Sequence, residues 1–340
     1  MILHNRPTIG SLEIQAVEKV IQSGQLSHSV EVKKFEEEFA NYLGLNEGAA
    51  VAMCNGTAAL FMALWVLNAK DKNVIFPAYT CSSLRHAVSM IGARERLCDV
   101  EDGTPNMNSS IGDNGDIVII PHMYGFPIRL KLRPGVHYIE DACQSLGAKI
   151  DGTPVGLQGD VSIFSFYATK LITSAGQGGM LVSRDKSLVD AVRDYLNFDC
   201  RKDNKSRFNF QMTDIQASMG RVQLKRLNNF VERRKEIFEF YKKQDLPLLG
   251  VLNNDPSIAP VPYRCILINN NPKLLIQKLM ENRVQAINPL ETWELLGNSN
   301  QFLSSIKMSQ RTISLPCYPS LNDENLKEIE IALNGIKKFL

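Results

Sequence analysis

The chain has 340 residues, of which 44% are hydrophobic, and its 38 basic and 36 acidic side chains leave a net charge of +2. This length permits a large core and two domains, while the balanced charge argues against nucleic acid or a membrane surface as a partner. The N-terminus lacks the basic and apolar segments of a signal peptide, and no apolar stretch approaches the roughly 20 residues of a membrane helix.

Two amphipathic helices are predicted at the start of the chain. Ser11 is expected to cap the first, which runs to about Ser23 with its apolar face formed by Ile14, Val17 and Ile21. The second ends at Gly44, and its apolar residues repeat at helical spacing: Val32, Phe35, Phe39 and Tyr42.

Short apolar runs then alternate with helical segments. The runs are nearly continuous, as expected of strands buried on both faces: AAVAMC, NVIFPAY, GDIVIIPHMYG, VHYIEDACQ, VSIFSFY and GGMLVS. Helical segments follow the first two runs, NGTAALFMALWVL and SLRHAVSMIG. Strands alternating with helices predict an α/β fold with a mostly parallel sheet.

After Ser187 the pattern becomes helical. One helix is predicted in SLVDAVRDYLNF, and a long one follows from TDIQASMG to FEFYKK, with a break expected near Asn228. The tail adds a strand in YRCILIN and two more helices. We therefore expect a large domain over residues 1–243 and a small α+β domain over residues 244–340.

The seven cysteines are scattered, without a C-x-x-C pair or a histidine at zinc spacing. No metal site is expected from them. An odd number of cysteines without a signal peptide predicts reduced thiols in the cytoplasm, most of them small core residues.

The segment NGTAALFMAL is the first candidate site. A strand that ends at Asn55 and opens a helix at Gly56 and Thr57 leaves free backbone N–H groups, which favour a phosphate. An ordinary turn capped by Thr57 is the alternative. Neither a P-loop nor a G-x-G-x-x-G motif is present, which argues against a dinucleotide site.

Two further segments place ionisable groups at strand ends. Glu140 and Asp141 close a buried strand, where they either face a cationic partner or are satisfied by neighbouring N–H groups. Lys170 lies between an apolar strand and a glycine-rich turn, which favours an amine whose pKa is lowered by burial; a lysine that reaches solvent is the alternative. A phosphate cradle, an acid and a lysine are together what pyridoxal 5'-phosphate (PLP) requires.

Segments along nearly the whole chain resemble those of a known family, and they occur in the same order. They include RPTIGSLEIQAVEKVIQSGQLS, NGTAALFMAL, EDACQSLGA, FSFYATKLITSAGQGGMLVS and FNFQMTDIQASMGRVQLKRL. The sequence resembles the DegT/DnrJ/EryC1/StrS sugar aminotransferases. This implies the aspartate-aminotransferase-like fold (PLP fold type I) with a seven-stranded sheet.

The resemblance also implies roles for individual residues. Lys170 would form the Schiff base with PLP, Asp141 would pair with the pyridine nitrogen, and Gln144 would lie beside the ring. The residues implied at the phosphate are Gly56, Thr57 and Ser165. Asn209 matches a residue that reaches the phosphate of the neighbouring subunit, which implies a homodimer with shared active sites.

The implied reaction is transfer of an amino group, with glutamate as the usual donor, to a nucleotide-linked keto-deoxysugar of a polysaccharide or glycoconjugate pathway. Lys170 favours transamination over dehydration, because relatives that dehydrate carry histidine there. The alternatives are a non-catalytic PLP- or sugar-binding regulatory protein and a PLP enzyme of another reaction, such as a sugar dehydratase.

Several positions depart from the family pattern or remain ambiguous. Cys81 stands where an aromatic ring usually faces the cofactor, with Tyr79 or another ring as its substitute. His122 and Tyr124 either line the pocket or pack. Trp293 falls where the small domain would face the site, but packing in the core is the favoured expectation. Two further departures are Gln177 and Gln211.

Overall fold

The computed structural model describes residues 1–250, 255–297 and 300–339. Its helices are α1 Ser11–Ser23, α2 Val30–Tyr42, α3 Gly56–Val66, α4 Ser83–Met90, α5 Lys186–Leu196, α6 Asp214–Lys243, α7 Pro272–Glu281, α8 Leu303–Arg311 and α9 Asp323–Ile336. Its strands are β1 Ala50–Met53, β2 Asn73–Pro77, β3 Arg94–Cys98, β4 Ile117–Pro121, β5 His137–Asp141, β6 Lys149–Ile150, β7 Thr153–Pro154, β8 Val161–Ser165, β9 Gly179–Val182, β10 Ile258–Ala259, β11 Cys265–Ile268 and β12 Thr312–Leu315.

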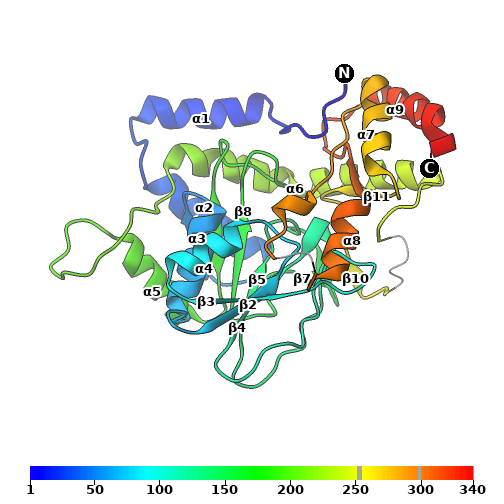
Figure 1. Cartoon of the computed structure of the whole chain (residues 1–340). Helices are drawn as coiled ribbons and strands as arrows, with labels where there is room; N and C mark the ends of the chain where they lie inside the picture. The colour runs from blue at the N-terminus through cyan, green and yellow to red at the C-terminus, as the bar shows by residue number, and fades with distance from the viewer. Residues whose placement is uncertain (251–254, 298–299, 340) are drawn as a thin grey trace.

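A seven-stranded sheet in the order β1-β9-β8-β5-β4-β2-β3 forms the centre of the molecule (Figure 1). Four neighbouring pairs are parallel: β3–β2, β2–β4, β4–β5 and β5–β8. Strand β9 runs antiparallel to both of its neighbours, β8 and β1. The prediction of a mostly parallel sheet is confirmed. Because the parallel strands point the same way, their carboxyl ends gather at one edge.

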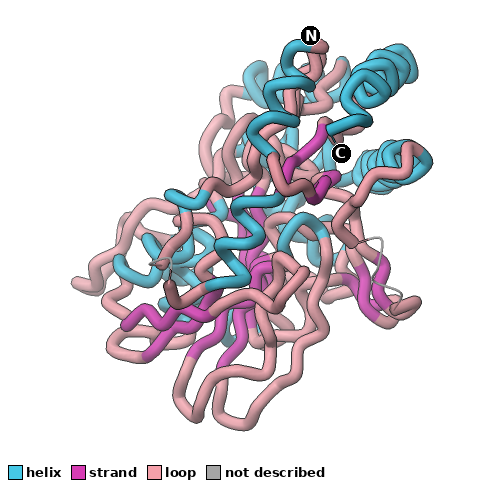
Figure 2. Tube along the Cα trace, turned by 45° about the vertical axis from the view of Figure 1, so that its right-hand side comes forward, coloured by secondary structure: helices cyan, strands magenta, loops and turns pink. Residues whose placement is uncertain are grey.

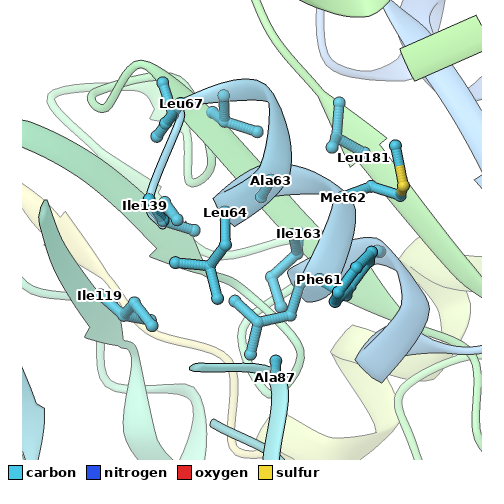
Figure 3. Packing of buried hydrophobic residues seen from close by; sticks show 14 of the residues in the cluster. Phe61, Met62, Ala63, Leu64, Leu67, Ala87, Ile119, Ile139, Ile163 and Leu181 are labelled. Atoms are coloured by element: carbon cyan, nitrogen blue, oxygen red, sulfur yellow. The ribbon is translucent and has the colours of Figure 1, made fainter. Parts of the chain in front are cut away.

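Helix α3 fills the space over one face of this sheet. Figure 3 shows its side chains packed among isoleucines from β4, β5 and β8 and Leu181 from β9. Residues 58–64 are all buried, so the helix is apolar all round rather than on one face only. This packing fixes the start of α3, where the candidate phosphate site lies.

Helices α2 and α6 cover the opposite face of the sheet. Phe35 and Phe39 of α2 are fully buried there, as the helical spacing predicts. The break predicted near Asn228 is wrong, because α6 runs uninterrupted from Asp214 to Lys243. Asn228 is exposed, so its weak helix propensity costs about 0.5 kcal/mol and does not interrupt the packed helix.

Helix α1 begins as predicted, but with a different cap and a different buried face. Gly10 is the N-cap, and its N–H donates to Glu13 Oε2 at 2.8 Å. Ile14 and Ile21 are exposed, whereas Glu13 is fully buried against α6. Gln223 donates to Glu13 at 2.7 Å, and Arg226 forms an ion pair with it.

The C-terminal part stands to one side of the main sheet (Figure 2). Its two-stranded antiparallel sheet, β11 and β12, is covered by α7 and α9 and shares a core with Ile2, which pairs with Val284. The strand and two helices predicted for the tail are present, and α8 and β12 add to them. The domain division at residue 243 remains a prediction. Among the described residues, no helix is long and apolar enough to cross a membrane.

Candidate active site

A cavity of about 740 Å³ lies at the carboxyl edge of the main sheet. It is lined by side chains that follow β1, β5 and β8 and by the start of α3. All the candidate site residues line it: Gly56, Thr57, Asp141, Gln144, Ser165, Lys170 and Asn209. Residues that are up to 153 positions apart in the chain therefore share one pocket.

The start of α3 presents unsatisfied donors to this cavity. Asn55 caps the helix by accepting the N–H of Ala58 at 2.8 Å, so the alternative of a Thr57 cap is wrong. Within the described part of the chain, the N–H groups of Gly56 and Thr57 donate to no acceptor. A Cβ on Gly56 would come within 2.9 Å of Ser165 Cβ, which is closer than side chains tolerate. Free N–H groups at a helix start, beside a serine hydroxyl, fit a phosphate.

Glu140 and Asp141 are neighbours with different environments. Glu140 is fully buried and accepts the N–H groups of Gly156 at 3.1 Å and Gly159 at 2.9 Å, so neighbouring N–H groups satisfy it. Asp141 faces the cavity, and its Oδ1 accepts the N–H of Cys143 at 3.0 Å. Among the described residues, no cation forms an ion pair with the Asp141 carboxylate, which leaves its charge for a cationic partner.

Gln144 is oriented by the backbone of the chain that follows β4. Its Oε1 accepts the N–H of Tyr124 at 2.9 Å, and its Nε2 approaches Met123 Sδ at 3.8 Å. Tyr124 adopts a left-handed conformation with φ 58°, which a bulky residue seldom adopts. With its oxygen engaged, the carboxamide offers its N–H groups to an acceptor in the cavity.

Lys170 is half-buried, and no described group accepts a hydrogen bond from its Nζ. The ammonium lies 5.5 Å from the centre of the Tyr263 ring. Burial lowers the pKa of Lys170, but electrostatic attraction to the nearby acidic groups of Tyr263, Cys143 and Asp141 outweighs burial and holds the pKa above the ordinary lysine value. The expectation of a lowered pKa for Lys170 is therefore wrong for the chain by itself.

Asn209 lies at the exposed end of the segment between α5 and α6. This segment projects from the body of the molecule (Figure 1), and it ends at the cavity with Asn209 and Phe210. Asn209 Oδ1 accepts the N–H of Gln211 at 3.1 Å, which fixes the carboxamide.

A second cavity of about 640 Å³ adjoins the first. The two share Thr80, Cys81, Gln144, Tyr167 and Lys170. The far wall comes from the C-terminal part, with Tyr263 and Arg264 beside β11 and residues 289–290 and 293–296. Apart from the segment around Trp293, sequence patterns missed this wall, because its residues belong to no motif and reach the site only through the fold.

The ambiguous positions are now resolved. Tyr124 lines the second cavity. His122 is fully buried instead, with its Nε2 at 3.0 Å from Glu140 Oε2, so it packs inside the protein. Trp293 is 82% exposed at the second cavity, so its prediction as a core residue is wrong. Cys81 lines both cavities, and Tyr79 lines neither because its hydroxyl is buried against Tyr124.

The cysteines are less buried than expected. Cys265 and Cys317 are buried, but Cys81 and Cys200 are exposed. The remaining three are half-buried: Cys54, Cys98 and Cys143.

Comparison with known proteins gives a match over almost the whole chain. The DegT/DnrJ/EryC1/StrS aminotransferase family matches residues 7–334. This chain belongs to that family. The assignment makes it a PLP-dependent sugar aminotransferase of fold type I.

Individual relatives agree with this assignment. The chain is 28% identical to the spore coat polysaccharide biosynthesis protein SpsC of Bacillus subtilis over 98% of its own length and 97% of that protein. It is also 28% identical to GDP-perosamine synthase of Escherichia coli O157:H7, over 97% of its own length and 96% of that protein. The PLP form of the putative sugar aminotransferase Spr1654 of Streptococcus pneumoniae has the same fold, with a TM-score of 0.87 and 21% identity. The match covers 100% of this chain and 99% of that one.

Proposed function

We propose that this aminotransferase moves an amino group from glutamate to a nucleotide-linked keto-deoxysugar, in the cytoplasm, for a surface polysaccharide or glycoconjugate. The observation that carries the proposal is the meeting of Lys170, Asp141 and the open start of α3 in one cavity. The relatives SpsC and GDP-perosamine synthase, whose names refer to polysaccharide and nucleotide-sugar synthesis, support the substrate class.

The residues of the first cavity fit PLP group by group. Gly56 and Thr57 would donate N–H groups to its phosphate, together with the Ser165 hydroxyl. Asp141 would accept from the ring nitrogen, and the carboxamide N–H of Gln144 would donate to the ring hydroxyl. When bound, PLP supplies an electron sink for a carbon that loses a proton.

Each charged residue has a separate task in this proposal. The Asp141 carboxylate would keep a proton on the ring nitrogen, because a nearby negative charge favours the protonated form. Lys170 Nζ would hold the cofactor between turnovers. When the donor amine takes its place, Nζ would be free to remove the proton from the donor Cα and later to deliver a proton to the sugar carbon. A binding protein without catalysis would need neither residue.

The same proposal includes a homodimer with shared sites. Three apolar side chains of helix α1 are exposed: Leu12 (56%), Ile14 (63%) and Ile21 (57%). Exposed apolar side chains gathered on one helix favour contact with another protein surface. The projecting segment that ends at Asn209 would then extend over a second copy. Asn209 lines the cavity of its own chain as well, and mixed dimers distinguish a contribution within the chain from one across the dimer.

The decisive experiment follows the visible absorption of the purified protein with PLP. The band of the bound cofactor should fade when glutamate is added and return with a nucleotide-linked keto-sugar. Lys170→Ala should bind PLP without this band and should not transfer the amine. A band that ignores glutamate would contradict the proposed donor, and turnover in Lys170→Ala would contradict the role of the lysine.

Mixed dimers test the shared site. Lys170→Ala and Asn209→Ala chains are each expected to lose activity and to regain part of it when mixed. Across a dimer, one of the two sites would combine the intact lysine of one chain with the intact asparagine of the other. If Asn209 acts only within its own chain, every site in the mixture keeps one defect and mixing restores nothing.

A further inference from the structure

Arg264 lines the second cavity as a cation without an acidic partner. Its guanidinium is half-buried, and within the described ranges no carboxylate lies at ion-pair distance from it. Charged groups removed from water are normally paired, because desolvation costs several kcal/mol per ion. A half-buried guanidinium that lines a cavity beside Lys170 therefore suggests that a ligand supplies the missing negative charge.

Neutral groups hold Arg264 in place. Its Nη1 donates to His4 Nε2 at 3.1 Å and to Ser314 Oγ at 3.3 Å. A guanidinium only donates, so His4 Nε2 must be the acceptor and the imidazole is uncharged. The guanidinium also lies 5.4 Å from the centre of the Tyr263 ring. These contacts fix the direction of Arg264 without neutralising it.

The other charged groups of the second cavity are engaged elsewhere. Arg85 is paired with Glu95, with Nε at 2.8 Å from Oε2. Glu294 is exposed and accepts the N–H of Glu291 at 2.8 Å, which caps a short helix. Lys170 and Arg264 are therefore the two cations of this cavity without an acidic partner among the residues that the structure describes, and both lie within 6 Å of the same Tyr263 ring centre.

We infer that Arg264 binds the α-carboxylate of the amino donor. This inference rests on the proposed function. The donor amine must replace Lys170 Nζ at the same cofactor carbon, so the carboxylate one carbon away lies close to Lys170. Arg264 is the cation on that side of the cavity, and guanidinium and carboxylate form paired hydrogen bonds. The diphosphate of a nucleotide-sugar is separated from its reacting carbon by ring atoms, which places it farther from Lys170.

The test compares two donors that differ only in this group. 4-Aminobutyrate is glutamate without its α-carboxylate. Single-turnover loss of the cofactor band gives kcat/KM for each donor with the wild type, Arg264→Gln and Arg264→Lys. Arg129→Gln is the matched control, because Arg129 forms an exposed ion pair with Asp151. Circular dichroism and the cofactor band establish that each variant is folded and loaded.

Arg264→Gln should lower kcat/KM for glutamate by about 30-fold or more, since losing a desolvated charge partner has at least that effect. The value for 4-aminobutyrate should stay within about twofold, because that donor cannot use the interaction. Arg264→Lys should recover part of the loss, because it keeps the charge without the paired geometry. The Kd of 2-methylglutamate, which binds but has no Cα hydrogen to lose, should rise with Arg264→Gln by a similar factor.

Equal losses with both donors would overturn the inference, as would a loss confined to the step that consumes the keto-sugar nucleotide. If the wild type prefers another amino acid, the same comparison is made with that amino acid and its decarboxylated amine. A wild-type band that no amino acid changes would instead overturn the proposed function, before any variant is compared.

Discussion

His4 should make the folded protein sensitive to mild acid. Its side chain is buried, and its Nε2 accepts from Arg264 at 3.1 Å and bonds to Ser314 Oγ at 2.8 Å. Burial and the charge of Arg264 lower the pKa of His4 to about 3. A proton on Nε2 would point at the N–H of a guanidinium, so the folded state keeps this imidazole neutral.

The sign and size of the effect follow from linkage. The pKa of an unfolded histidine is about 6.5, so the unfolded chain gains a proton below that pH while the folded chain does not. The stability is therefore complete above pH 6.5 and falls as the pH is lowered toward 3, by up to about 1.4 kcal/mol per pH unit. Between pH 6.5 and 4.5 the loss should reach about 2 to 3 kcal/mol.

Urea unfolding of the wild type and His4→Gln at several pH values measures this loss. Glutamine keeps an acceptor oxygen for Arg264 but does not titrate, so the difference between the two proteins isolates the imidazole. His86→Gln, at an exposed histidine, is the control. Wild-type and His4→Gln curves that run parallel from pH 6.5 to 4.5 would refute the reasoning.

Glu140 and Asp141 provide a matched pair of predictions. Glu140→Gln would turn an amide N–H₂ toward backbone donors, so urea unfolding should show a loss of about 2 to 4 kcal/mol with kcat nearly unchanged. Asp141→Asn should leave the free energy of unfolding unchanged but lower kcat about 100-fold or more, because it removes the negative charge that faces the ring nitrogen. Steady-state kinetics of the PLP-loaded variant measures this loss of kcat. The opposite pattern in either variant would contradict the assigned roles.

Buried strands of the main sheet were readable from the sequence, and an edge strand was not. Strand β4, for example, is apolar and buried along its whole length because it is covered on both faces. β3 pairs only with β2 at the edge, and its first three residues, Arg94, Glu95 and Arg96, are exposed. A charged, exposed strand carries no hydrophobic pattern, so no pattern of this kind could predict it.

The first helix illustrates a second limit. Periodicity located α1 correctly, but it assigned the core-facing side to Ile14 and Ile21, which are exposed. The buried side chains of α1 are Val20 and Glu13, and Glu13 is satisfied by Gln223 and Arg226 of α6. A buried carboxylate is stable only with such partners, and they lie more than 200 residues away in the chain.

The site, too, could be predicted only in part. The family resemblance predicted the residues of the first cavity, because those residues lie in recognisable motifs. Local sequence also suggested a lowered pKa for Lys170, since an apolar strand and a glycine turn surround it. The raised pKa comes from Tyr263 and Cys143, which belong to other parts of the chain. Motifs therefore located the reacting groups, whereas the contribution of Tyr263 to the pKa of Lys170 and the proposed donor contact at Arg264 depend on the wall that the C-terminal part adds.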